Sequence, residues 1–284
     1  MTRRAIRCGT WITMPEWQAD ALVLSTRPHG EGSAVVTVLT AEAGRHAGLV
    51  RGGSSSRMRG VLQPGNRVRA SWRARLPEQL GQMQLELVQS IPALLLDDAL
   101  RLAGLSSICA LLDGSLPERE AQPELFVGTN ALFDLISIED SSNRWLEGYI
   151  RWELGLLDAA GFQLDLLRCA ASGVTDRLAY VSPRSGGAVA EGQAGEFASR
   201  MLALPAFLGG VACNRHDYDA GLSLTGHFLA RRSGRALPRR IVRGRAHTAA
   251  ARNCSICKAA SFAMYRCRSF FLSSELELLV VVIS

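Results

Sequence analysis

The sequence predicts a mixed α+β fold in which a small N-terminal β-barrel of five strands precedes an α-helical domain. Short β-rich segments separated by turn residues continue to about residue 90, and helical periodicity begins after Ile91-Pro92. The charge changes over the same boundaries, with a net +6 over 1–90, −9 over 91–230 and +9 over 231–284. Such asymmetry indicates that the segments have separate tasks.

The N-terminal segments are short, rich in Val, Leu and Thr, and bounded by turn signals such as PHGEG at 28–32. We expect strands at Ala21–Ser25, Ser33–Thr40, Ala47–Arg51, Val68–Ala74 and Met83–Val88. Five short strands at this spacing favour a small closed barrel, and the OB-fold is the natural five-stranded candidate.

The following region has helical spacing and helix-favouring composition. Helices are expected at Ala93–Leu112, Glu124–Ile138, Ser142–Ala160, Glu196–Leu204 and Leu222–Arg232. The third ends before Gly161, as a helix followed by a terminating glycine should. Between Asp165 and Val189, several glycines and a proline interrupt helicity around the β-like stretch Leu178–Val181.

The stretch 51–75 holds seven arginines and no lysine, aspartate or glutamate. In the strand that starts at Arg67, the odd-numbered residues through Arg75 share one face. Guanidinium groups on one face repel one another unless an anion neutralises them, and nucleic-acid phosphates are the obvious anion. The alternative is a solvated polar face over a packed Trp72. We favour Trp72 as a core residue over Trp72 as a platform for a stacked base.

The segment Gly52-Gly53-Ser54-Ser55-Ser56 has two interpretations. It wraps a phosphate backbone with its amides, or it is simply a mobile loop. It lacks the GxxxxGK[ST] pattern, so a nucleotide-binding P-loop is not supported.

Candidate catalytic and metal-binding residues are sparse. The sequence has no HExxH motif. Its densest polar cluster, at Asn214–Asp219, is explained equally well by a polar loop. We therefore expect no enzymatic activity. Cys254 and Cys257 form a CxxC pair with Cys267 and His247 in range, which is weak evidence for zinc. Scattered cysteines, without a signal peptide or an apolar run long enough to span a bilayer, indicate a reducing cytoplasmic protein.

A series of motifs between about residues 15 and 240 carries a resemblance to a known family. They are ALVLSTRPHGE from Ala21, VTVLTAEAGR from Val36, LVRGG from Leu49, LQPGN from Leu62, Gly161-Phe162, CA with SG from Cys169 to Gly173, YVSPRSG from Tyr180 and LTGHFL from Leu224. In this order they resemble the RecO family of bacterial DNA repair proteins.

The resemblance implies an OB-fold DNA-binding domain at 15–90 and a helical domain at 91–240. The helical domain would carry a zinc-finger-like β-hairpin insert at about 165–190, which here lacks most of the cysteines because only Cys169 matches. RecO-like proteins bind single- and double-stranded DNA and anneal complementary strands. They engage the C-terminal tail of single-stranded-DNA-binding protein (SSB) and partner RecR to help load RecA. No catalytic residue, cofactor or membrane is implied, and the expected location is the cytoplasm, in association with the nucleoid.

We expect the arginines of the barrel to neutralise DNA phosphates. They are Arg27, Arg45, Arg51, Arg57, Arg59, Arg67, Arg69, Arg73 and Arg75. Ser54–Ser56 stand where relatives often carry more basic residues. Two other functions stay open: a protein-interaction scaffold whose basic face binds an acidic protein tail, and an RNA-binding OB-fold protein.

Both ends of the chain differ from this pattern. We hypothesise that Met14 is the natural start and that 1–14 are a non-native extension. The likeness ends at about Arg240, where the basic, Cys-containing tail 241–284 begins, and a frameshift near that point is our hypothesis for its atypical composition.

Overall fold

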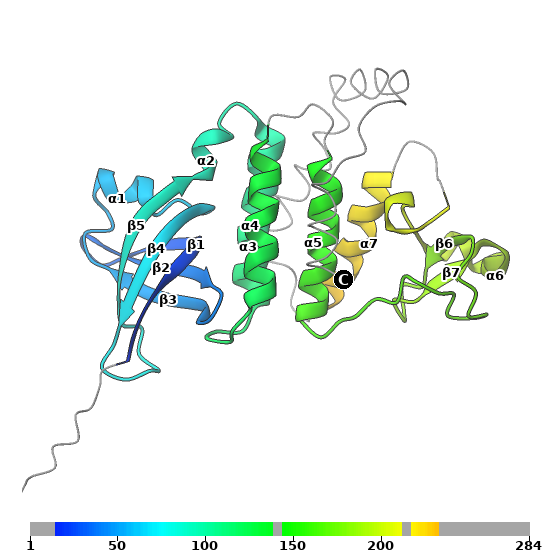
Figure 1. The fold of residues 1–284 in the computed structure, drawn as a ribbon, viewed down its shortest axis with the longest axis horizontal. Helices are drawn as coiled ribbons and strands as arrows, with labels where there is room; N and C mark the ends of the chain where they lie inside the picture. The colour runs from blue at the N-terminus through cyan, green and yellow to red at the C-terminus, as the bar shows by residue number, and fades with distance from the viewer. Residues whose placement is uncertain (1–14, 139–143, 212–216, 233–284) are drawn as a thin grey trace, which may run out of the picture.

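The computed structural model describes residues 15–138, 144–211 and 217–232, and places a five-stranded N-terminal sheet beside a helical part (Figure 1). The predicted mixed α+β class, with its five N-terminal strands and its helical continuation, is confirmed. The hypotheses on 1–14, on the tail and its zinc site, and on Asn214–His216 lie outside the described residues.

The five N-terminal strands form one closed barrel in the order β1-β2-β3-β5-β4. They are β1 (Glu16–His29), β2 (Ser33–Thr40), β3 (Gly44–Val50), β4 (Asn66–Arg73) and β5 (Gln82–Ser90). Strand β1 pairs antiparallel with both β2 and β4, whereas β3 meets β5 in parallel through the Leu49 and Gln82 pair. Because β5 lies between β3 and β4 in this order, the chain from β3 to β4 must cross one end of the barrel.

Strand β1 is buried on both faces over Ala21–Ser25. Ala21 and Val23 belong to the barrel core, whereas Leu22 and Leu24 belong to a second core that they share with the helices. A strand covered on both faces has a continuous apolar run instead of an alternation, and the sequence ALVL has this character. The barrel is therefore held against the helical part by its own first strand.

Four long helices follow the barrel and lie side by side, the first two next to the barrel and the last farthest from it (Figure 1). They are α3 (Ala99–Ser115), α4 (Pro123–Ser137), α5 (Trp145–Ala159) and α7 (Asp217–Arg232). The prediction of one helix over Ala93–Leu112 was wrong, because a short helix α2 (Ile91–Leu94) precedes α3. The break falls at Asp98, whose carboxylate accepts hydrogen bonds from the amides of Leu100 and Arg101 and so starts a new helix. None of the helices in the described ranges is both long and apolar enough to cross a membrane.

A small three-stranded sheet lies at the far end of the helical part from the barrel (Figure 1). Its strands are β6 (Leu178–Val181), β7 (Ala188–Ala190) and β8 (Leu202–Ala203), with helix α6 (Glu191–Ala194) after β7. The helix predicted over Glu196–Leu204 was wrong. A 3₁₀ turn over Gly195–Arg200 leads into β8, whose Leu202 pairs with Val181 of β6, so strand pairing overrides the helical composition.

Candidate nucleic-acid interface

Strand β4 alternates between the barrel core and the outside, as predicted from its period of two. Val68, Ala70 and Trp72 are buried, whereas Arg69 and Arg73 are exposed. Trp72 is 3% exposed and its indole donates a hydrogen bond to the Leu80 carbonyl at 2.9 Å. The interpretation of Trp72 as a core residue is therefore confirmed, and its ring does not lie on the outer face.

The protein itself supplies counter-charges to the β4 arginines. Arg69 lies opposite Asp20 of β1 and forms an ion pair with it at 3.0 Å. Arg67 forms an ion pair with Asp134 of α4 at 2.7 Å, and its side chain is only 19% exposed. Carboxylates from a neighbouring strand and from a helix thus supply part of the counter-charge of Arg67 and Arg69, and phosphate binding by these two residues stays a prediction.

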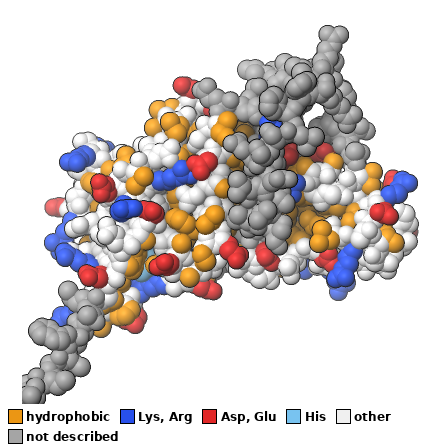
Figure 2. Space-filling model, viewed as in Figure 1, with side chains coloured by type: hydrophobic (Ala, Val, Ile, Leu, Met, Phe, Trp, Pro, Cys, Tyr) orange, Lys and Arg blue, Asp and Glu red, His pale blue; other side chains and the backbone are white. Residues whose placement is uncertain are grey.

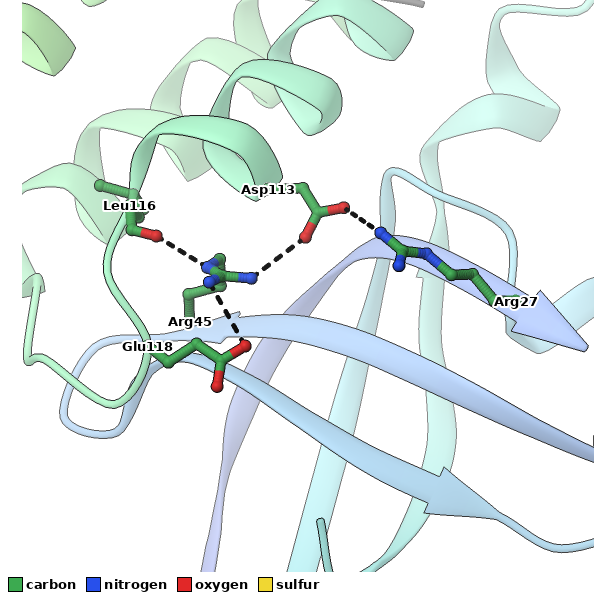
Figure 3. A network of polar contacts seen from close by, with 5 residues as sticks. All are labelled: Arg27, Arg45, Asp113, Leu116 and Glu118. Carbon is green, nitrogen blue, oxygen red and sulfur yellow. Dashed lines mark hydrogen bonds and ion pairs between the residues drawn. The ribbon is translucent and has the colours of Figure 1, made fainter. Parts of the chain in front are cut away.

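Arg45 of β3 ties the barrel to the helical part (Figure 3). Its guanidinium donates to the Leu116 carbonyl at 2.8 Å and forms ion pairs with Asp113 and Glu118, each at 3.4 Å. Arg27 reaches the same Asp113 from β1 at 3.8 Å, but its side chain is 77% exposed whereas that of Arg45 is 17% exposed. Arg45 is thus largely enclosed at the junction, and Arg27 remains open to solvent.

The connection between β3 and β4 contains a short helix, α1 (Ser56–Val61), that the sequence interpretation missed. The Ser55 hydroxyl accepts a hydrogen bond from the Met58 amide at 3.4 Å and caps it. The Ser54 amide also donates to the Gly32 carbonyl at 3.5 Å, which joins this connection to the β1–β2 turn. The Gly-Ser segment therefore provides the N-cap of α1. A serine directly before a helical run was the sequence signal that could have identified this helix.

Three exposed arginines lie on this helix or shortly before it in the chain, and we call Arg51, Arg57 and Arg59 the α1 arginine cluster. Within the described ranges none of the three forms an ion pair, in contrast to Arg45, Arg67 and Arg69. Figure 2 shows basic side chains along the end of the barrel that lies farthest from the helices, with acidic side chains interspersed. Arg75, just after β4, is exposed as well, and Arg73 reaches the Gln82 side chain at 3.5 Å.

An aromatic cluster of His46, Trp72 and the partly buried Trp17 packs within and against the barrel core. His46 packs edge-on against Trp72 and Trp17, with ring centroids 4.5 and 5.2 Å apart. Burial, together with the nearby positive charge of Arg119, lowers the pKa of His46 to about 4. The imidazole is therefore neutral at physiological pH and acts as an apolar packing group.

The predicted hairpin region contains one buried cysteine. Cys169 is 2% exposed, and its sulfur accepts a hydrogen bond from the Ala190 amide at 3.3 Å. A hydrogen bond from the Ser172 side chain lowers the pKa of Cys169 to about 7, and backbone amides act in the same direction. Throughout the described part of the chain, no three His, Cys, Asp or Glu side chains gather where they could hold a metal ion. Cys169 with its serine neighbours does not fit the donor set of a structural zinc site.

Comparisons with known proteins identify the family. The family model described as "Recombination protein O N terminal" matches residues 14–91, and "Recombination protein O C terminal" matches residues 96–241. A protein from Rhodospirillum centenum called "DNA repair protein RecO" is 57% identical over 219 residues, which cover 76% of this chain and 86% of the relative. Relatives of the same name from Jannaschia sp. and Rhodospirillum rubrum are 49% and 45% identical, covering 76% and 79% of this chain and 86% and 93% of their own lengths. The chain therefore belongs to the RecO family.

Proposed function

We propose that the chain is a non-catalytic DNA-binding protein of recombinational DNA repair. Its relatives are named for DNA repair, and the two matching family models are named for recombination. Following the resemblance, it anneals complementary strands and helps to load RecA on single-stranded DNA coated with SSB, together with RecR. It would act in the cytoplasm, at the nucleoid.

The barrel is proposed to be an OB-fold and to be the DNA-binding domain, with 15–90 and 91–240 as the two domains. The strand order β1-β2-β3-β5-β4, with β3 parallel to β5, supports this assignment. The OB-fold is a five-stranded Greek-key barrel that binds oligonucleotides through its loops and one face.

One observation carries the choice of surface, namely that the α1 arginine cluster has no carboxylate partner within the described residues. An arginine that already pairs with a carboxylate of the protein gains less free energy from binding a phosphate than an arginine without such a partner. We therefore propose Arg51, Arg57, Arg59, Arg73 and Arg75 as the principal phosphate contacts, with Arg27 and Arg69, which have carboxylate partners, at the margin. Arg45 and Arg67 would act mainly by fixing the barrel to the helices.

Fluorescence anisotropy with labelled single-stranded and duplex oligonucleotides tests the proposal on the full chain. Replacing Arg51, Arg57 and Arg59 together by alanine should weaken binding to both DNA forms. Arg69→Ala is the matched control, because it removes a cation that Asp20 already neutralises. Equal affinities in the wild type and the triple variant would refute the assigned surface.

The same assay separates the two alternatives. A protein-interaction scaffold would bind a labelled acidic peptide, such as the C-terminal tail of SSB, through these arginines while binding DNA only weakly. An RNA-binding protein would prefer an RNA oligonucleotide over DNA of the same sequence.

A further inference from the structure

A cleft of about 250 Å³ opens at the seam of the barrel where β3 meets β5, beside α1. It exists because β3 and β5 share the pair of Leu49 and Gln82, after which β3 runs on toward α1 while β5 turns along β4. Helix α1 lies beside this opening and contributes Met58 to its lining. The cleft therefore follows from the strand arrangement of the barrel.

The walls and the rim of the cleft differ in character. Val50, Met58 and Leu85 provide apolar walls, and all three pack in or against the barrel core. Gln82 and Gln84 add side-chain amides, which both donate and accept hydrogen bonds. An apolar cleft with a few amide groups suits a flat, aromatic and hydrogen-bonding ligand. The Met58 thioether also makes favourable contacts with aromatic rings.

The charges at the rim identify what such a ligand is attached to. Arg51 lies in the lining itself, and Arg57 and Arg59 flank Met58 on the six-residue helix α1. All three arginines are exposed, and within the described residues no carboxylate pairs with them. An apolar cleft with side-chain amides, bordered by cations without carboxylate partners, suits single-stranded nucleic acid, with a base in the cleft and its phosphates at the neighbouring arginines.

We propose that this cleft takes one unstacked base of single-stranded DNA while the α1 arginine cluster binds the adjoining phosphates. A volume of about 250 Å³ equals the space of roughly eight water molecules, which suits one base and excludes a base pair. The cleft thus distinguishes single strands from duplexes, whose bases are stacked and paired. The inference rests on the proposed DNA-binding function, and it deepens that function by assigning a base-binding subsite.

Leu85→Trp tests the subsite because the larger side chain fills the cleft. Val88→Trp is the matched control, since Val88 lies on the same strand, is 64% exposed and is not part of the lining. We expect Leu85→Trp to weaken binding of a single-stranded oligonucleotide about tenfold, as for the loss of one base contact. Duplex affinity should stay within about twofold, and Val88→Trp should change neither affinity.

A second measurement observes the base itself. A single-stranded oligonucleotide carrying 2-aminopurine should brighten when the wild-type chain unstacks that base, and the rise should be lost in Leu85→Trp. Met58→Ala serves as the second variant, because it removes one wall without adding volume. Met58→Ala should lower the 2-aminopurine fluorescence. It therefore keeps the subsite testable if thermal melting shows that Leu85→Trp does not fold.

The outcomes separate the subsite from the function on which it rests. If the triple arginine variant loses DNA binding but both cleft variants keep wild-type affinity and signal, the subsite is refuted and the proposed function stands. If the triple variant binds DNA like the wild type, the assigned surface and the subsite both fail. If the wild-type chain binds neither single-stranded nor duplex DNA, the proposed function fails. Equal losses for single strands and duplexes in Leu85→Trp would also refute a base-binding cleft. Loss of acidic-peptide binding with unchanged DNA binding would assign the cleft to a protein ligand.

Discussion

Arg45 of β3 and Asp113 of α3 form an ion pair, with 3.4 Å between Nη1 and Oδ1, across the junction between the barrel and the helices (Figure 3). Both side chains are 17% exposed, so the pair is largely shielded from solvent. The Arg45 guanidinium also binds the Leu116 carbonyl and Glu118, which makes it the centre of the junction network.

Arg45→Ala should lower the free energy of unfolding by about 2 kcal/mol, because it leaves the Leu116 carbonyl and Asp113 without their enclosed partner. Urea denaturation followed by circular dichroism measures this change. Arg27→Ala is the control, since the 77% exposed Arg27 contributes about 0.5 kcal/mol or less. A loss of DNA affinity in Arg45→Ala without a loss of stability would contradict the structural role.

The triple replacement of the α1 arginine cluster should change the salt dependence of single-strand binding. Each lost phosphate contact lowers the slope of log K against log [salt] by about 0.7, so three contacts lower it by about 2. Anisotropy titrations over a range of sodium chloride concentrations measure the slope. Arg69→Ala should change it less, and an unaltered slope in the triple variant would exclude these residues as phosphate ligands.

His46 should make the fold sensitive to acid. Its pKa is lowered to about 4 in the folded chain, so the unfolded chain takes up a proton near pH 6.5 while the folded chain does not. The associated stability is fully present above pH 6.5 and is lost as the pH falls from 6.5 to about 4, with a total of about 3 kcal/mol.

His46→Phe tests this pH dependence because phenylalanine keeps an aromatic ring against Trp17 and Trp72 but cannot titrate. The melting temperature should fall less between pH 7 and pH 4.5 in the variant than in the wild type. An identical loss in both proteins would mean that other groups cause the acid sensitivity.

Gly44→Ala should disrupt the contact between the β2–β3 turn and the loop after α3. Gly44 has φ +60°, and a Cβ there would lie 1.8 Å from the Glu120 carbonyl oxygen. We expect a cost of about 3 kcal/mol or more, measured by urea denaturation. Gly30→Ala is the matched control, because Gly30 has φ +58° with nothing within 4 Å, and backbone strain alone costs about 1 kcal/mol. If both variants lost the same free energy of unfolding, the chain would have moved to relieve the clash with the Glu120 carbonyl.

The barrel could be predicted from sequence because its information is local. The alternation on β4 placed Trp72 in the core and the arginines outside, and β2 has the bounds that its Val- and Thr-rich run predicts. Length was predicted less well, since β1 extends well beyond the apolar run Ala21–Ser25.

The electrostatics of the site could not be predicted in the same way. Asp113 and Asp134 lie on helices that follow the barrel in the chain, and only the tertiary structure brings them to Arg45 and Arg67. Counting arginines therefore overestimated the free positive charge of β4. The same limit applies to β8, where pairing with β6 decided the conformation of Leu202.

Because β1 is buried on both faces, the barrel is poorly suited to expression as a separate fragment. A fragment ending near residue 90 would expose Leu22, Leu24 and Leu39, which the helices cover in the whole chain. The exposed apolar surface would make that fragment self-associate. In pull-down experiments the fragment would also bind other proteins non-specifically, and this binding would be mistaken for affinity. Dissection of this protein should therefore use point substitutions in the intact chain.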